Sequence, residues 1–396
     1  MFDQLIQDVR YGLRALAARP GFAAAAIVTL ALGIGANAAI FNVIDALLLR
    51  PLPYPHGDRL VTIDDLYPKV GEEQGGSTIP DYLDQRAQAP ALADSAIFQL
   101  ASFNLSANGN VERLRGMRST ASLFPTLGVH AALGRVFTED EAVPGRDHVA
   151  VLSYDTWQNR FAADPAIVGR DVRLGDAPYR IVGVMPRGFF FPDRAVKIWA
   201  PYSIRPEQRT DAERGRSDVE AIGRLKAGSS IAELDTELDT IVARNAARST
   251  DLRNNYASTG FKIRARELRR HLFGGLGSAL WLLQAMVAVV LLIAGANVVN
   301  LLLARFNARR RDFALRSALG ADRRRLVRQI VIETSLLAIG GGVLGAVVAR
   351  ACVPLIRAFG LGATLDAYGP DLGLGWVQSG LVLALALLVG LALGGA

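Results

Sequence analysis

Residues 305–333 read RFNARRRDFALRSALGADRRRLVRQIVIE, and this stretch decides the organisation of the chain. Its first part, residues 305–329, holds nine arginines and two aspartates, a net charge of +7 that equals the formal charge of the whole protein. An uncharged run, residues 274–304, lies directly before it, and residues 329–349 contain Glu333 as their only charge. A short basic connection between two membrane-length apolar segments is typical of a cytoplasmic loop.

The composition agrees with a protein that has part of its mass in lipid. Hydrophobic residues make up 51% of the 396 residues and charged residues 20%, against roughly 25% charged residues in soluble domains. Because the basic excess lies in one loop between apolar segments, we interpret it as a topology signal and predict no nucleic-acid partner. Cys352 is the only cysteine, which excludes an internal disulfide and a cysteine-based metal cluster.

The first 49 residues predict a surface helix followed by a membrane span. Residues 1–21 have the spacing of an amphipathic helix that lies along the cytoplasmic face of the membrane. Residues 22–49 form the first span, and their first 23 residues carry no charge, which suffices to cross a bilayer. A signal peptide cleaved near Ala36-Asn37-Ala38 is the alternative. We favour a retained helix because the apolar character continues to Leu49.

Residues 50–273 have the character of a folded domain outside the cytoplasm, with mixed helix and strand signals. Residues 149–152 predict a buried strand, and residues 172–184 predict a hairpin because a Gly-Asp turn separates two strand-like segments. Ser230 and Glu233 have capping-box spacing and predict a helix that continues to about residue 247. We therefore expect a large α+β domain inserted between the first and second spans.

The remaining chain predicts three further spans, so that the membrane part is a four-helix module. The expected order is span 274–304, basic loop 305–329, span 330–352, short external loop 353–376 and span 377–396. The chain ends inside its last apolar run, so we expect it to be a fragment of a longer protein. Small and amide residues in the spans predict close helix packing. These residues are Gly33, Gly35, Asn37, Asn297, Asn300, Gly341 and Gly345.

Motifs for enzymatic chemistry do not occur in the sequence. It contains no GxxxxGK[ST] phosphate loop, no HExxH and no GxSxG. The four histidines lie at positions 56, 130, 148 and 271 and lack metal-ligand spacing. We therefore expect no enzymatic activity, no metal and no cofactor on this chain.

The basic loop has more order than a topology signal needs. Residues 312–319 predict a short helix, Gly320 suits the left-handed position after a helix end, and Asp322 suits an N-cap of the next helix. The loop therefore predicts a helix–turn–helix in the cytoplasm, with a solvated basic loop as the alternative.

The segment DFALRSALGA at residues 312–321 resembles the coupling helix of the FtsX-like permease module in MacB-type ABC transporters, where the motif reads E-[IF]-A-[IL]-R-x-A-L-G-A. This chain has aspartate in place of the first glutamate. Segments of the external domain, among them WQNRF at 157–161 and IVGVMP at 181–186, resemble the MacB periplasmic core domain. The N-terminal segment DVRYGLRALAARPGF is similar to the duplicated orphan permeases of this superfamily, called ADOP. In that group two modules lie in tandem, and this chain would be the N-terminal half or a fragment.

The resemblance implies a mechanism and partners. A separate cytoplasmic ABC ATPase would dock on the coupling helix, and the second and third spans would carry its motion to the periplasmic domain. A second permease module, as homodimer or tandem half, and a periplasmic adaptor protein would complete an efflux system in the lipid of the bacterial inner membrane. The alternative is an FtsX-like regulator that activates periplasmic cell-wall hydrolases. The residues expected to contact the ATPase are Asp312, Phe313, Ala314, Arg316, Ala318, Leu319 and Gly320.

Overall fold

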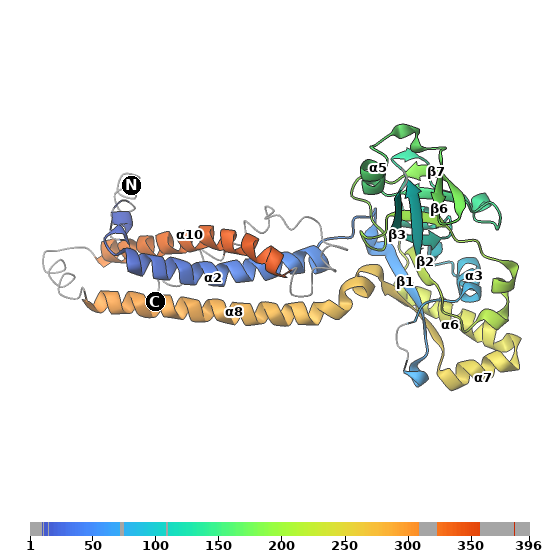
Figure 1. Cartoon of the computed structure of the whole chain (residues 1–396). Helices are drawn as coiled ribbons and strands as arrows, with labels where there is room; N and C mark the ends of the chain where they lie inside the picture. Colours follow the sequence, from blue (N-terminus) through green and yellow to red (C-terminus); the bar gives the residue numbers. More distant parts are fainter. Residues whose placement is uncertain are drawn as a thin grey trace. The chain divides into compact units, whose positions relative to one another are not determined.

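The computed structural model describes residues 10, 12–14, 16–71, 75–107, 110–308, 323–356 and 384. The chain divides into two compact units (Figure 1). One unit comprises Pro51–Gly274, and the other comprises Met1–Arg50 together with Gly275–Ala396. We call them the external domain and the membrane unit. The sequence-based expectation for the external domain was 50–273.

The external domain is built on one mixed sheet in which the described strands follow the order β10-β1-β9-β2-β3-β8-β5-β7-β4, with β6 paired to β2 and β7. Most neighbours are antiparallel, and β3–β8 and β5–β7 are parallel. The strands are β1 Leu60–Leu66, β2 Leu92–Ala107, β3 Asn110–Ser119, β4 Leu133–Gly134, β5 Val149–Leu152, β6 Asp171–Leu174, β7 Ala177–Val184, β8 Ile198–Pro201, β9 Glu220–Leu225 and β10 Lys262–Glu267.

The helices of the external domain begin at side-chain caps that the sequence provides. Thr78 accepts a hydrogen bond from the Asp81 amide at the start of α3, and Ser230 accepts one from the Glu233 amide at the start of α6. The predicted strand at 149–152, the hairpin formed by β6 and β7, and the predicted helix after Ser230 are confirmed. The helices are α3 Ile79–Gln88, α4 Leu123–Leu127, α5 Tyr154–Arg160, α6 Ile231–Arg248 and α7 Thr250–Thr259.

Strand β1 is buried along its whole length because both of its faces are covered. Successive side chains of a strand point to opposite faces of the sheet. Leu60 belongs to a core that contains the fully buried Trp199. Val61 and Ile63 belong to a second core that includes Leu234 of α6. Strand β1 therefore separates two cores, and it carries the buried polar residues Thr62, Asp64 and Asp65.

The membrane unit contains three described long helices, labelled in Figure 1. They are α2 Pro20–Ile44, α8 Leu268–Ala308 and α10 Arg323–Ile356, and a π-helical turn, Asp45–Leu49, continues α2. Within the part of the chain that the structure describes, three helical stretches are long and apolar enough to cross a membrane: Pro20–Leu49, Leu268–Ala304 and Val331–Cys352. The third helix continues one turn past the expected end at residue 352.

Several expected segments lie partly or wholly outside the described residues. These are the surface helix at 1–21 in part, the centre of the loop 305–329, most of the loop 353–376, and the fourth span at 377–396.

The first turn of α8 carries Arg269, Arg270 and His271, and the uncharged run of this helix begins at Gly274. The first seven residues of α8 therefore belong to the external domain, and we place the start of the span at this uncharged run.

Candidate functional site

Helices α2 and α10 meet along a seam of glycines. A Cβ atom added to Gly35 would lie 2.8 Å from the carbonyl oxygen of Gly345 and 2.8 Å from Cβ of Val348. One added to Gly341 would lie 2.7 Å from Cβ of Leu30. Ordinary contacts of a Cβ are at least 3.4 Å long. The missing side chains therefore let the two backbones approach closely, as small residues do in membrane helix pairs.

Helix α2 contacts α8 through one glycine and one amide. A Cβ on Gly33 would lie 2.9 Å from Cδ1 and 3.3 Å from Cα of Leu291. One turn later, Asn37 Nδ2 donates to the carbonyl oxygens of Gly33, at 2.9 Å, and of Val287, at 2.7 Å. Gln284 Nε2 in turn donates to Asn37 Oδ1 at 2.9 Å. Sequence reasoning singled out Asn37 but missed Gln284, its partner on the facing helix.

Asn297 and Asn300 do not take part in this packing among the described helices. Both side chains are exposed, in contrast to the helix-to-helix hydrogen bonds expected from the sequence. The buried stripe of α8 advances by three or four residues at each step, and the two asparagines lie off it. The stripe consists of the buried residues Leu280, Leu291, Ala294, Val298 and Leu302 and the half-buried residues Gln284 and Val287.

The seven residues expected to contact an ATPase, from Asp312 to Gly320, lie outside the described residues. Helix α8 reaches Ala308 on one side of them and α10 begins at Arg323 on the other.

A buried ionic cluster in the external domain was not predicted from the sequence. The side chain of Arg214 is 3% exposed and forms ion pairs with Asp81 and Asp84 of α3. Its Nε lies 2.7 Å from the carboxylate of Asp211, and Arg248 of α6 pairs with Asp84 at 3.3 Å. The cluster fixes the segment around Arg214 onto two helices. About 130 residues separate Arg214 from its α3 partners, so no local spacing could reveal it.

The electrostatics of this cluster follow from burial. Burial lowers the pKa of Arg214, but its carboxylate partners outweigh this and raise the pKa above its ordinary value. Burial raises the pKa of Asp65 well above the ordinary value, and the neighbouring carboxylate of Asp81 raises it further. The Asp65 carboxylate accepts a hydrogen bond from the Thr78 amide at 3.0 Å. Two acidic groups and one guanidinium therefore share a nearly dry environment.

The first turn of α8 is part of the core of the external domain. Leu268 is 2% exposed and lies in the core that contains Trp199, and Leu272, four residues later, packs against the same core. Residues four apart lie on one helix face. The external domain therefore holds the first turn of α8, which leads into the second span, through apolar contacts.

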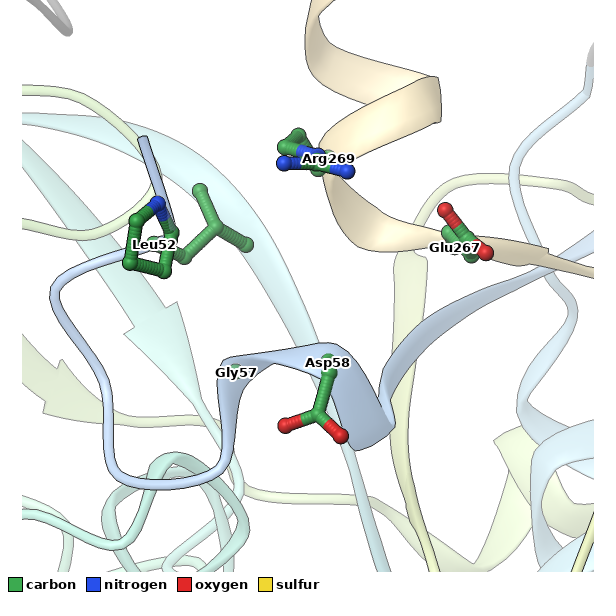
Figure 2. A pocket seen from close by; sticks show the side chains of 6 residues that line it. Leu52, Gly57, Asp58, Glu267 and Arg269 are labelled. Carbon is green, nitrogen blue, oxygen red and sulfur yellow. The ribbon is translucent and has the colours of Figure 1, made fainter. Parts of the chain in front are cut away.

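A small open cavity lies beside this turn (Figure 2). Its volume is about 150 Å³. The segment that follows the first span and the segment that leads into the second span both line it. Its walls carry two carboxylates and one guanidinium. The described residues contain no cluster of three or more acidic, histidine or cysteine side chains that could hold a metal ion, here or elsewhere. The lining residues are Pro51, Leu52, Gly57, Asp58, Glu267 and Arg269.

Comparison with known proteins assigns the two parts of the chain to two protein families. Residues 23–241 match the MacB-like periplasmic core domain family, and residues 285–396 match the FtsX-like permease C-terminal family. Both are permease segments, and no ATP-binding domain is among the matched families.

Relatives of the chain include the macrolide export ATP-binding/permease proteins MacB. The protein from Burkholderia cenocepacia (strain HI2424) is 25% identical over 250 residues, which cover 62% of this chain and 33% of that protein. The protein from Psychrobacter arcticus is 24% identical over 348 residues, which cover 85% of this chain and 48% of that protein. The chain thus spans less than half the length of these two curated relatives.

The solved structure of the periplasmic region of MacB from Actinobacillus actinomycetemcomitans aligns with 52% of this chain and 88% of its own length, at 17% identity and a TM-score of 0.36. The match to the core-domain family covers more than half of the sequence. The chain therefore belongs to the family with a MacB-like periplasmic core domain, and with its FtsX-like segment it is a membrane permease of the MacB/FtsX-like ABC transporter type.

Proposed function

We propose that this chain is the permease subunit of an ABC-type efflux system, in which a separate cytoplasmic ATPase acts on loop 305–329 and α8 passes the motion to the external domain. The observation that carries this proposal is the course of α8. It is one unbroken helix of 41 residues whose first turn lies in the core of the external domain and whose last residues enter the basic loop. At about 1.5 Å per residue, such a helix is about 60 Å long.

The contacts of the membrane unit support this mode of action. The glycine seam between α2 and α10 leaves little room for the two helices to slide, because added atoms would meet backbone. The contact between α2 and α8 includes two hydrogen bonds from side-chain amides, which can be exchanged at low cost. Hydrogen bonds between membrane helices average about 0.6 kcal/mol. Gly33 of α2 also packs closely against Leu291 of α8, but α8 is the most exposed of the three described spans, and we propose it as the element that moves.

The partners follow from the same proposal. The curated relatives are named as ATP-binding and permease proteins in one chain, whereas the matched families here are permease segments alone. In this proposal the ATPase is a separate protein. A second permease module, as homodimer or tandem half, and a periplasmic adaptor protein would complete the assembly in the bacterial inner membrane.

ATPase coupling provides the first test. The chain is reconstituted with a stand-alone cytoplasmic ABC ATPase, and the basal and stimulated ATPase rates are measured. Arg316→Glu and Gly320→Pro are expected to remove the stimulation and to leave membrane insertion intact. Asp176→Lys, a charge reversal at an exposed turn of the external domain, is the control and should retain it. Stimulation that survives both loop changes would show that residues 312–320 are not the docking element.

Topology provides the second test. Alkaline phosphatase is active only outside the cytoplasm, so a fusion near Arg170 is expected to be active and one near Ala321 inactive. The reverse pattern would overturn the orientation.

The alternative, an FtsX-like regulator of cell-wall hydrolases, draws support from the match of residues 285–396 to the FtsX-like family. It predicts that the external domain binds a hydrolase and that candidate export substrates do not change the ATPase rate. Efflux predicts substrate-stimulated ATPase activity.

A further inference from the structure

The first turn of α8 faces the sheet with a polar residue between two apolar ones. Leu268 and Leu272 contact the core that contains Trp199. His271, three residues after Leu268, points the same way because residues three and four apart share a helix face. Its side chain is 27% exposed, so it is half-enclosed by the domain.

The partner of His271 is an aspartate on the adjacent strand. His271 Nδ1 lies 3.5 Å from Oδ2 of Asp64, whose side chain is 7% exposed in the middle of β1. A nearly buried carboxylate needs a compensating charge or hydrogen bond. The charged imidazole of His271 supplies that charge, so the helix turn and the strand are complementary.

The neighbouring strands also contribute charge to this site. Glu220 is the first residue of β9 and Arg266 lies on β10, and these two strands flank β1. Burial raises the pKa of Glu220. The hydrogen bond and the charge of the Asp64 carboxylate raise the pKa of His271, and the Glu220 carboxylate raises it further. Burial of the imidazole and the positive charge of Arg266 lower this pKa. The acidic groups prevail, so the folded domain favours the charged imidazole.

We infer that His271 is a positioning residue that fixes the first turn of α8 on the sheet through Asp64, more firmly when its imidazole is charged than when it is neutral. The consequence for export rests on the proposed function, because α8 is the helix that would carry the motion. A firmly held turn passes a displacement of α8 to β1, whereas a loosened turn lets the helix move without the sheet.

The direction of the pH dependence follows from the raised pKa. The stabilisation is fully present below the ordinary histidine pKa of about 6.5 and is lost as the pH rises through the higher value of the folded domain. Acidification from about pH 8 to about pH 6 therefore tightens the contact, in the range in which histidine titrates.

Hydrogen exchange on the full chain in lipid nanodiscs tests the inference. Exchange of peptides covering residues 262–275 is compared at pH 6 and pH 8 after correction for intrinsic rates. The wild type is expected to exchange more slowly at pH 6 by up to about fivefold, the range of a part-exposed ion pair. His271→Gln is expected to exchange fast at both values, and His271→Arg, which keeps the charge, slowly at both. His130→Gln, at an exposed site, should behave as wild type.

Two further results test whether the contact between His271 and Asp64 causes the pH dependence of exchange. Asp64→Asn should remove the pH dependence, and adding His271→Gln to it should have no further effect, because both changes abolish one interaction. A wild type without pH dependence, or a His271→Gln variant that retains it, overturns the inference. This measurement needs no ATPase. Its failure therefore leaves the proposed function standing, and ATPase stimulation that survives the loop variants leaves the role of His271 standing.

Discussion

Replacing Gly35 by valine tests the packing of the membrane unit most directly. The glycine lies in α2 where the backbone of α10 is closest. Its added Cβ alone would lie 2.8 Å from the Gly345 carbonyl oxygen and 2.8 Å from Cγ1 of Val348. Neither neighbour is the free end of a flexible chain, since one is backbone and the other a branched side chain next to its own helix. The helices must therefore move apart or tilt.

The expected cost can be placed within limits. Overpacking of a well-packed interior costs about 1–3 kcal/mol. The control is Gly295→Val in α8, because no described atom outside the neighbouring helix backbone lies within 4 Å of the added Cβ. This variant changes the helix propensity but introduces no clash. The difference between the two variants is therefore the packing cost alone. We expect Gly35→Val to lower the free energy of unfolding of the membrane unit by about 1–3 kcal/mol more than Gly295→Val.

The assay is unfolding of the full chain from mild detergent by increasing fractions of SDS, followed by far-UV circular dichroism. Tryptophan fluorescence, in which Trp157 and Trp199 report on the external domain, checks that this domain stays folded in both variants. If Gly35→Val and Gly295→Val unfold at the same SDS fraction, the close approach of α2 and α10 is wrong, and with it the argument that these two helices cannot slide.

Three further changes test the polar contacts. Asn37→Leu removes the amide hydrogen bonds between α2 and α8 and should cost about 0.6–1.7 kcal/mol in the same SDS titration; Asn300→Leu, at an exposed site, should cost nothing measurable. Arg214→Met leaves two carboxylates of α3 without their buried counter-charge and should destabilise the external domain by about 3–5 kcal/mol in urea unfolding. The exposed ion pair of Arg216 is the control, and Arg216→Met should cost at most about 1 kcal/mol. Asp65→Asn should stabilise the external domain more at pH 8 than at pH 5: a raised folded-state pKa is favourable while the acid is protonated, and this is lost as the pH rises through it. Equal effects at the two pH values would contradict that account.

Local and one-dimensional features could be predicted from the sequence because their causes are local. Charge distribution and uncharged run length depend on composition along the chain, and they identified the segments that became α2, α8 and α10. The hairpin at β6 and β7 follows from a turn between two alternating strands, and the start of α6 follows from the cap at Ser230. Glycine clusters in a span indicated close packing, and Gly35, Gly341 and Gly345 lie where another helix touches them.

Features that depend on which helix face is covered could not be predicted. Helix α8 is apolar on all sides, so its sequence gives no signal for the stripe that packs inward. Asn297 and Asn300 looked equivalent to Asn37 in the sequence, but among the described residues it is Asn37 that lies opposite an amide on another helix, whereas Asn297 and Asn300 are exposed. The Arg214 cluster shows the same limit over a longer range, because its members come together only when the sheet and three helical segments have formed.

The contacts along α8 differ in kind, and this difference bears on the proposed transmission. At its start the helix is held by Leu268 and Leu272 in an apolar core, and such a contact weakens only when buried area is exposed to water. Further along, it is held by the hydrogen bonds of Asn37 with Val287 and Gln284 and by an apolar cluster with α2 that includes Leu291, Val298 and Leu302. In the proposed mechanism, a force applied at the basic loop would shift the membrane part of α8, which is mostly exposed among the described residues, before it detached the first turn from the external domain. The helix would move within the membrane unit, and its first turn would displace β1. The ion pair of His271 with Asp64 adds a polar contact between this turn and the sheet.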